Sequence, residues 1–417
     1  MQTATVSSLS AGKALAGCVA AAMLAGCGVV RPAQNDMQPP AGAVAYIAGG
    51  VPSRPVSATG RGKITHVIYI VQEQRSFDNL FCSYRGADAA KCSRGSQGIP
   101  LEGNCTLSDT FQDFERARKS GNFSHEKTRC PGYARPEYRT VPPGETQPYR
   151  SIAASYVLGD RMFDSTGNPT FESHQFDIAA QADGVDQPFG STPPDGCVYR
   201  AKVRQFNAPP KAACESYKTL ADELTTAGLT WSYYAAGAAE PTWDAFGWVH
   251  GNSAGTSPPT QFLTDIANGH LNTVTWVTPE LRDSDRSGSR SATGPAWVAA
   301  VVNAVGESQF WDSTAIFVTW SGYGGWADHV PPPYMNRGGL GFRVPLLVIS
   351  PYAKQNYVSH EQYESVSVLR FAEDVFGLEP LAGADARAAS PGPDCFNFSQ
   401  KPRSFVPISS EGSMAIR

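Results

Sequence analysis

Three polar segments of this sequence carry side chains that could do chemistry together. Glu73 directly follows one apolar run, and Asp328 and His329 lie in a Gly- and Pro-rich stretch that follows another. Thr170 and His174 belong to a third segment, which leads into a helical pattern. Carboxylates and imidazoles bind metal ions, and a hydroxyl becomes a nucleophile when a metal or a base activates it. Ligands of open α/β sheets bind beyond the carboxyl ends of the strands, so we expect these segments to form one site.

Short apolar runs are the elements that must position these groups. Four continuous runs predict strands that are buried on both faces. Segments with helical spacing lie between or after them. Strands alternating with helices predict an α/β fold, with helices on both faces of a sheet, in one domain over residues 63–410 that precedes a tail at 411–417. The predicted strands are residues 67–71, 274–277, 315–320 and 346–349, and the predicted helices are residues 171–180, 217–227, 296–310 and 363–376.

The N-terminal residues are typical of an export signal. They carry one charge, Lys13, and then an apolar run that is too short to span a bilayer. The run ends in Leu24-Ala25-Gly26-Cys27, which looks like a bacterial lipobox whose cysteine is lipidated. An ordinary signal peptide with an incidental Cys27 is the alternative. We expect a lipoprotein signal over residues 1–26, a flexible tether over 27–62, and a chain that is lipid-anchored to the bacterial cell envelope, otherwise periplasmic or secreted.

Export would place the cysteines in an oxidising compartment, where most should pair. Two of the nine cysteines lie in the signal and lipobox, which leaves seven. Four fall within residues 82–150, a stretch of little periodicity that predicts a disulfide-pinned excursion over the sheet. Cys197 and Cys214 make a plausible local pair, and Cys395 is the expected unpaired thiol. The spacings do not match a zinc knuckle, and the connectivity stays open.

The charge balance excludes two classes of protein. The 417 residues include 34 Lys and Arg against 38 Asp and Glu, and 41% are hydrophobic. So apolar a chain with so small a net charge is not disordered. It also lacks the basic excess that coats a nucleic-acid backbone, so we expect no nucleic-acid partner.

Several motif blocks, in order, resemble the bacterial phosphoesterase family of acid phosphatases and phospholipases C, which is related to alkaline phosphatases. The resemblance runs from about Lys63 to Ile408, nearly the whole chain after the tether. The family has a strand ending in Gln-Glu-Asn-Arg-Ser-Phe-Asp, a Ser or Thr nucleophile before Phe-x-x-His, and a closing Trp-Asp-Asp-x-Gly-Gly-x-x-Asp-His-Val-x-Pro-Pro. These blocks correspond to residues 72–78, 170–174 and 320–333, and residues 342–345, 350–353 and 358–360 also match.

The resemblance implies an alkaline-phosphatase-like fold with a mostly parallel central sheet and a hydrolase acting on a phosphomonoester or a phospholipid. Thr170 would be the nucleophile at a helix N-terminus, with His174 and His125 as further catalytic groups. Glu73 and Gln74 would hold a divalent metal ion, which lowers the pKa of the hydroxyl. Candidates for binding the substrate or its phosphate are Arg75, Arg286, Asp328 and His329.

The sequence departs from the family pattern at the metal site. Gln74 stands where the family has Asn, which moves the amide oxygen one methylene outward. Ser321 and Gly322 replace the Asp-Asp pair and remove two anionic ligands. Arg286 replaces the His of a Ser-Asp-His-Pro segment, and Arg does not ligate metals. We infer that the metal binds with reduced affinity and that the site is more tolerant of anions.

Three hypotheses therefore stay open. The chain is an active exported hydrolase, or an impaired family member that binds an anionic ligand or partner, or a surface lipoprotein with a structural role. Simpler roles also exist for the individual residues. Thr170 would serve as a helix N-cap and Glu73 as an ion-pair partner of Arg75, while His174 would pack and Asp328 and His329 would shape their loop.

Overall fold

The computed structural model describes residues 59–94, 98–167, 170–182, 185–189, 201–205, 211–213, 216–249, 255–334, 339–381 and 383–410. All of them belong to one compact unit, Pro40–Arg417. The expected signal and lipobox, most of the tether, Cys197, Cys214 and the tail lie outside the described residues. Within the described part, no helix has both the length and the apolar character needed to cross a membrane.

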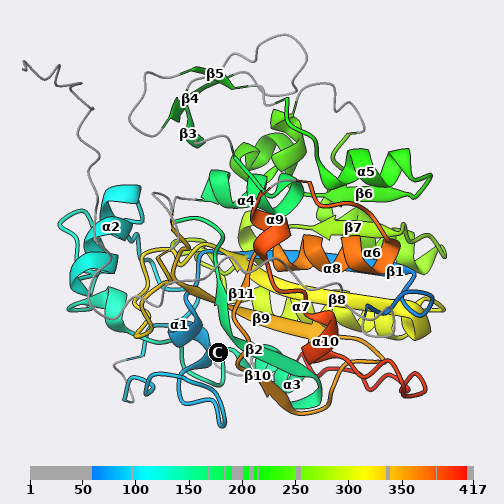
Figure 1. Cartoon of the computed structure of the whole chain (residues 1–417). Helices are drawn as coiled ribbons and strands as arrows, with labels where there is room; N and C mark the ends of the chain where they lie inside the picture. The colour runs from blue at the N-terminus through cyan, green and yellow to red at the C-terminus, as the bar shows by residue number, and fades with distance from the viewer. Residues whose placement is uncertain are drawn as a thin grey trace, which may run out of the picture. The chain divides into compact units, whose positions relative to one another are not determined.

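An eight-stranded sheet forms the centre of the unit, in the order β10-β2-β9-β8-β1-β7-β6 with β11 beside β2 (Figure 1). β1 is parallel to both of its neighbours, β8 and β7, whereas β9 is antiparallel to β8 and β2. The sheet is thus mostly parallel, as expected. Its strands are β1 (His66–Glu73), β2 (Val157–Phe163), β6 (Trp231–Tyr234), β7 (Val274–Val277), β8 (Thr314–Ser321), β9 (Arg343–Ile349), β10 (Tyr357–Ser359) and β11 (Tyr363–Glu364).

The four predicted strands are confirmed as β1, β7, β8 and β9. Every residue of β7, β8 and β9 is buried, and so is every residue of β1 except His66. Continuous apolar runs were expected to be covered on both faces, and they are. Three further strands form a small antiparallel sheet: β3 (Val185–Phe189), β4 (Ala201–Gln205) and β5 (Lys211–Ala213).

Helices form two layers on the central sheet (Figure 1). One layer holds α3, α6 and α7, in which α7 contacts both of the others, and the second holds α4, α5, α8 and α9. Right-handed crossovers between parallel strands place the two groups on opposite faces. The helices of the two layers are α3 (Gln147–Ser155), α4 (Thr170–Ala179), α5 (Leu220–Thr226), α6 (Pro259–Ala267), α7 (Gly294–Gly306), α8 (Ser367–Phe376) and α9 (Gly383–Arg387).

Helix ends differ from the prediction for local reasons. α5 begins at Leu220 because Thr219 is its N-cap. The Thr219 hydroxyl accepts a hydrogen bond from the Asp222 backbone N–H, and the Asp222 carboxylate accepts one from the Thr219 backbone N–H. α8 begins at Ser367 because Tyr363–Glu364 pair with β2 as β11. Short 3-10 helices occupy connections: η3 (Pro136–Tyr138), η4 (Gly237–Ala239), η5 (Pro241–Trp243), η6 (Ala245–Trp248), η7 (Leu281–Asp283) and η8 (Trp311–Ser313).

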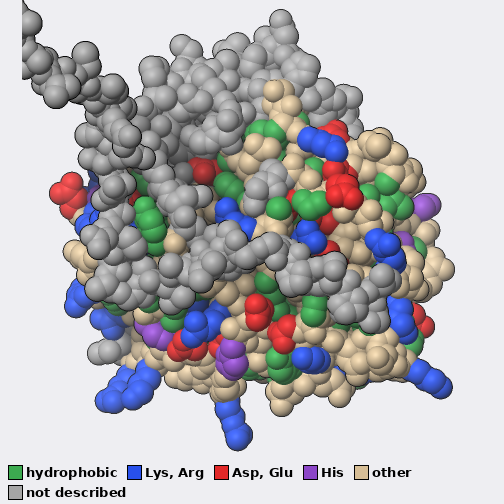
Figure 2. Space-filling model, in the orientation of Figure 1, with side chains coloured by type: hydrophobic (Ala, Val, Ile, Leu, Met, Phe, Trp, Pro, Cys, Tyr) green, Lys and Arg blue, Asp and Glu red, His purple; other side chains and the backbone are tan. Residues whose placement is uncertain are grey.

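The expected disulfide-pinned excursion is present. It directly follows α1 (Phe77–Phe81) and contains α2 (Phe111–Ser120) before α3 begins. The disulfides join Cys82 to Cys92 and Cys105 to Cys130. Cys395, in the short helix α10 (Gly392–Cys395), is a buried free thiol, as predicted. On the face shown in Figure 2, basic and acidic side chains are interspersed rather than gathered by sign.

Candidate active site

The candidate site begins where β1 and β8 end, because their register pairs Glu73 with Ser321. The Ser321 hydroxyl donates to Glu73 Oε2 over 2.7 Å, and both residues are buried. The parallel pairing brings two carboxyl ends of strands to one edge of the sheet, where ligands of α/β proteins bind. The segments that follow these two predicted strands therefore do meet.

α4 brings His174 to this edge, four residues after Thr170 and hence on the same helix face. His174 Nε2 lies 2.9 Å from Glu73 Oε1, and Nδ1 lies 4.0 Å from Asp177 Oδ2. Burial lowers the pKa of His174, but the Glu73 charge and hydrogen bond, helped by Asp177 and Asp164, outweigh burial and raise it. His174 therefore holds one oxygen of the Glu73 carboxylate in place.

Gln74 connects Thr170 to the excursion. Its Nε2 donates to Thr170 Oγ1 over 2.6 Å and to Asp109 Oδ2 over 3.0 Å. The Gln74 backbone has φ +55°, in the left-handed region that side chains rarely adopt. A Cβ at Gly324 would collide with the Gln74 carbonyl oxygen, so glycine is required opposite this turn. The strained turn after β1 aims the amide at the hydroxyl, and such strain is common at functional sites.

Two carboxylates near this cluster were absent from the sequence-based site. Asp109 contacts Gln74, and burial raises the pKa of Asp109 to about 6 although the Arg286 charge opposes the shift. Asp164 directly follows β2 and accepts a bond from the Ser173 hydroxyl over 2.9 Å. Burial, with the Asp177 charge, raises the pKa of Asp164 to about 7.

The two candidate arginines occupy different surroundings. Arg75 is buried, and its Nε donates to the Asp285 carbonyl over 2.6 Å while another nitrogen donates to Asn79. Burial lowers the pKa of Arg75 to about 10. Arg286 is partly exposed, lies 5.9 Å from the Trp243 ring, and acts electrostatically on Asp109. Arg286 thus acts on a carboxylate that contacts Gln74, and a phosphate-binding role stays a prediction for both arginines.

Asp328 and His329 lie in a cluster built around Arg343, the first residue of β9. Arg343 Nε is 2.8 Å from Asp328 Oδ1, and its side chain is fully buried. Arg343 also pairs with Asp78 at 3.3 Å. The ligand atoms of Asp78, Asp328 and His329 lie close enough together to hold a metal ion. Because Arg343 already balances both carboxylates, we assign this cluster to holding the loop, and substrate contact by Asp328 or His329 stays a prediction.

The ion pairs of His329 predict a pH-dependent stability. Burial lowers the pKa of His329, but the hydrogen bonds to Asp78 and Asp88 and the charge of Asp78 outweigh burial and raise it. A group whose pKa is higher in the folded than in the unfolded protein stabilises the fold. This stabilisation is complete below the pKa of the unfolded state and is lost as the pH rises through the pKa of the folded state. We expect His329→Gln to lower the free energy of unfolding more at about pH 5.5 than at about pH 9, since free His titrates near 6.5. Urea unfolding of both proteins at each pH measures this; equal losses would contradict it.

His125 lies on α2. Its Nε2 is 3.2 Å from Asp113 Oδ1, and its Nδ1 accepts the Lys127 backbone N–H. Asp113 also closes the capping box of α2 with Thr110. His125 is therefore placed to fasten its loop to α2, and its catalytic role stays a prediction.

The donor set around Thr170 fits a hard divalent cation. The available groups are oxygens: the Glu73 carboxylate, the Thr170 hydroxyl, the Gln74 amide oxygen and the Asp109 carboxylate. Mg²⁺ and Ca²⁺ prefer such ligands. The two Glu73 oxygens each accept one protein hydrogen bond, which leaves lone pairs for a cation.

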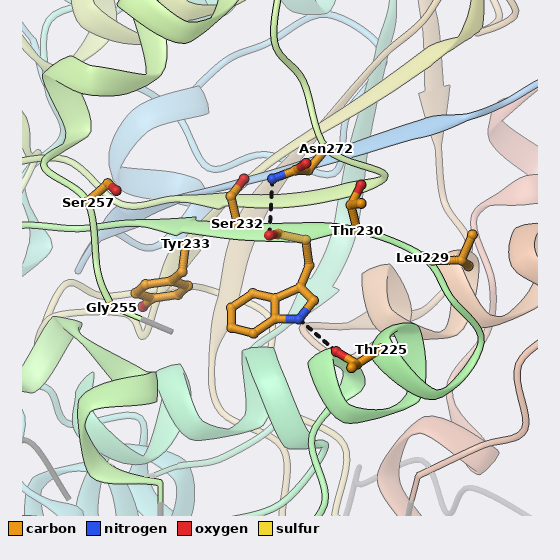
Figure 3. A pocket seen from close by; sticks show the side chains of 9 residues that line it. Thr225, Leu229, Thr230, Ser232, Tyr233, Gly255, Ser257 and Asn272 are labelled. Atoms are coloured by element: carbon orange, nitrogen blue, oxygen red, sulfur yellow. Dashed lines mark hydrogen bonds between the residues drawn. The ribbon is translucent and has the colours of Figure 1, made fainter. Parts of the chain in front are cut away.

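A cavity of about 510 Å³ lies along β6, away from the predicted site residues (Figure 3). Its wall includes Trp231, whose indole N–H donates to Thr225 and whose carbonyl accepts from Asn272. None of the sequence-predicted residues lines it, and we assign it no role in the site.

The sequence model of the Phosphoesterase family matches residues 64–379. Phospholipase C B of Mycobacterium tuberculosis (strain CDC 1551 / Oshkosh) is 31% identical over 183 residues, covering 37% of this chain and 35% of that protein. Non-hemolytic phospholipase C of Pseudomonas aeruginosa is 25% identical over 394 residues, covering 76% of this chain and 54% of that protein. The aligned part thus spans about a third to a half of these relatives.

Among solved structures, a protein in the alkaline phosphatase superfamily from Vibrio parahaemolyticus is similar over 79% of this chain and 70% of its own. Its sequence identity is 12% and the TM-score is 0.41.

Proposed function

Because this chain belongs to the Phosphoesterase family, we propose that it hydrolyses phosphoric ester bonds with Thr170 as the nucleophile. The observation that carries this proposal is the 2.6 Å bond from Gln74 Nε2 to Thr170 Oγ1 at the start of α4. A donor at the hydroxyl oxygen favours the form that carries negative charge. The first N–H groups of a helix lack partners within the helix and can bind phosphate oxygens.

In the proposed reaction, Thr170 Oγ1 bonds to phosphorus as the ester P–O bond breaks, and the leaving oxygen takes up the hydroxyl proton. Water then cleaves the phosphothreonine and regenerates the hydroxyl. A divalent ion, when bound, would neutralise phosphate charge and lower the pKa of the hydroxyl. Glu73, Thr170 and the amide oxygen of Gln74 would hold it. His174 and Ser321 each hydrogen-bond one oxygen of the Glu73 carboxylate and so fix its orientation.

The comparisons suggest two substrate classes. The matching family is named Phosphoesterase, and both relatives described above are named phospholipases C. We therefore propose a phosphomonoester or a phospholipid as the substrate. The test is hydrolysis of p-nitrophenyl phosphate, p-nitrophenylphosphorylcholine and phosphatidylcholine vesicles, before and after chelation. We expect turnover of one class, loss with EDTA and recovery with added divalent ion. Background rates on all three substrates in the presence of Mg²⁺, Mn²⁺ and Ca²⁺ would contradict the proposal.

A second candidate is an impaired member that binds an anionic ligand. Ser321 and Gly322 in place of two carboxylates, and the Arg286 charge beside Asp109, favour this alternative. The same assay separates the two, because an impaired member binds phosphate without turning over any ester.

We also propose export and lipid anchoring through Cys27, supported by the apolar run that ends at this cysteine. Expressed in a bacterial host with a radiolabelled fatty acid, the chain should incorporate label into the membrane fraction. Cys27→Ser should abolish labelling, while Cys18→Ser should not. Labelling that survives Cys27→Ser would contradict the anchor.

A further inference from the structure

We propose that Asp164 supplies a metal-binding carboxylate that this chain lacks at Gly322. The inference rests on the proposed function, because it assumes a divalent cation beside Thr170. The motif that this chain resembles has aspartates at both 321 and 322, and here neither residue is acidic. Asp164, at the end of β2, belongs to no motif that the sequence singled out.

The Asp164 carboxylate lies beside the space that a side chain at 322 would enter. Asp164 Oδ2 is 3.5 Å from the position of a Cβ on Gly322. Two backbone hydrogen bonds hold Asp164 against the residues that precede β9. Its N–H donates to the Phe342 carbonyl, and its own carbonyl accepts from the Gly341 N–H. In the family motif, a carboxylate at this place belongs to the residue after β8. In this chain, the carboxylate belongs to Asp164, the residue after β2.

The charges around Asp164 leave room for a cation. Its hydrogen-bond donors among the described residues are neutral: the Ser173 hydroxyl at 2.9 Å and the Thr166 N–H at 3.1 Å. Asp177 Oδ2, also buried, accepts no hydrogen bond within the described part of the chain. Glu73 and Asp177 lie 2.9 Å and 4.0 Å from the ring nitrogens of His174, and Asp164 also acts electrostatically on this imidazole. Buried carboxylates require compensating positive charge, which a divalent ion would provide.

Asp164 is connected to the proposed metal ligands through two adjacent residues. Gly322, whose Cβ position lies 3.5 Å from Asp164 Oδ2, follows Ser321, whose hydroxyl donates to Glu73. The resulting set of oxygen donors suits Mg²⁺, Mn²⁺ or Ca²⁺. The cluster of Asp78, Asp328 and His329 is a weaker candidate, because the Arg343 guanidinium occupies it.

The experiment measures Mn²⁺ binding to the full chain by calorimetry and by the EPR signal of the free ion. Asp164→Asn removes the charge and keeps the shape. The double variant Asp164→Asn with Gly322→Asp returns the carboxylate to the position of the motif, where φ +74° is tolerated better by Asp than by most side chains. Asp160→Asn is the matched control: it is a buried aspartate of the same strand that accepts the Asp88 N–H. Thermal unfolding monitors the fold of each variant.

We expect Asp164→Asn to weaken Mn²⁺ binding at least about tenfold, the loss seen even for groups behind a ligand. The double variant should recover most of that loss, and Asp160→Asn should bind as the wild type does. Unchanged binding in Asp164→Asn, a double variant no better than the single one, or a wild type that binds no Mn²⁺ would each overturn the inference. Hydrolysis is measured separately: Thr170-dependent turnover with unchanged Mn²⁺ binding in Asp164→Asn would sink the Asp164 assignment alone. Absence of turnover in a wild type that binds Mn²⁺ through Asp164 would sink the proposed function alone.

Discussion

Thr170→Ala should lower kcat/KM for a phosphoric ester by at least about 10³-fold, because the substitution removes the attacking oxygen. Thr170 begins α4, and its hydroxyl receives the Gln74 amide hydrogen at 2.6 Å. Substrate affinity should change much less, since the helix N–H groups that would bind phosphate belong to the backbone. The measurement is steady-state kinetics on the ester that proves to be the better substrate.

Two variants control for indirect effects of the Thr170 substitution. Thr170→Ser keeps the hydroxyl and should retain activity to within about tenfold of the wild type. Thr319→Val removes a buried hydroxyl from β8 of the central sheet, which donates to the Pro345 carbonyl at 3.0 Å. This variant should leave kcat unchanged. Wild-type kcat in Thr170→Ala would exclude Thr170 as the nucleophile.

Arg343→Met should reduce the free energy of unfolding by about 3–5 kcal/mol, the cost typical of removing one partner from a buried ion pair. The Arg343 side chain is fully buried, contacts Asp328 at 2.8 Å and Asp78 at 3.3 Å, and donates to the carbonyls of Asp88 and Asp160. Met fills similar volume but removes the counter-charge of Asp328 and leaves Asp78 with His329 as its partner. Burial already raises the pKa of Asp328 to about 6 in the presence of the arginine. Urea unfolding of the purified chain measures the loss.

Arg161→Met provides the comparison for Arg343→Met. Arg161 pairs with Asp88 at 3.3 Å, but both side chains are more than 40% exposed. Exposed pairs contribute about 0–1 kcal/mol, so this variant should unfold almost as the wild type does. If the two substitutions cost the same, the central role assigned to Arg343 is wrong.

Continuous apolar runs predicted the centre of the sheet from sequence alone. Residues 67–71 and 315–320 became β1 and β8, and the groups that follow them meet at one edge. β2 was missed because Gly159, Asp160 and Arg161 interrupt its apolar pattern, and its pairing with β9 shifts register between Gly159 and Met162. The carboxylate after β2, Asp164, was therefore missed as well.

The other features that the sequence could not predict are contacts between residues that are far apart in the chain. Arg343 and Asp78 are 265 positions apart in the sequence, and no local pattern indicates that they pair. Asp109 lies in a disulfide-pinned stretch without periodicity, so its bond to Gln74 had no signal in spacing. By contrast, Glu73, Thr170 and His174 were identified together because motifs fix their types, and the structure joins Glu73 to His174 at 2.9 Å.

The most direct test of the central claim is to trap the covalent intermediate. The full chain, with divalent ion, is mixed with excess p-nitrophenyl phosphate or p-nitrophenylphosphorylcholine and quenched in acid during steady-state turnover. Mass spectrometry of the peptides then locates any phosphoryl group, and Thr170→Ala is treated in the same way. The account predicts phosphorylation at Thr170, either bare or carrying the choline ester, and none in the variant. Ester hydrolysis with label on another residue, or at an unchanged rate in Thr170→Ala, would contradict it.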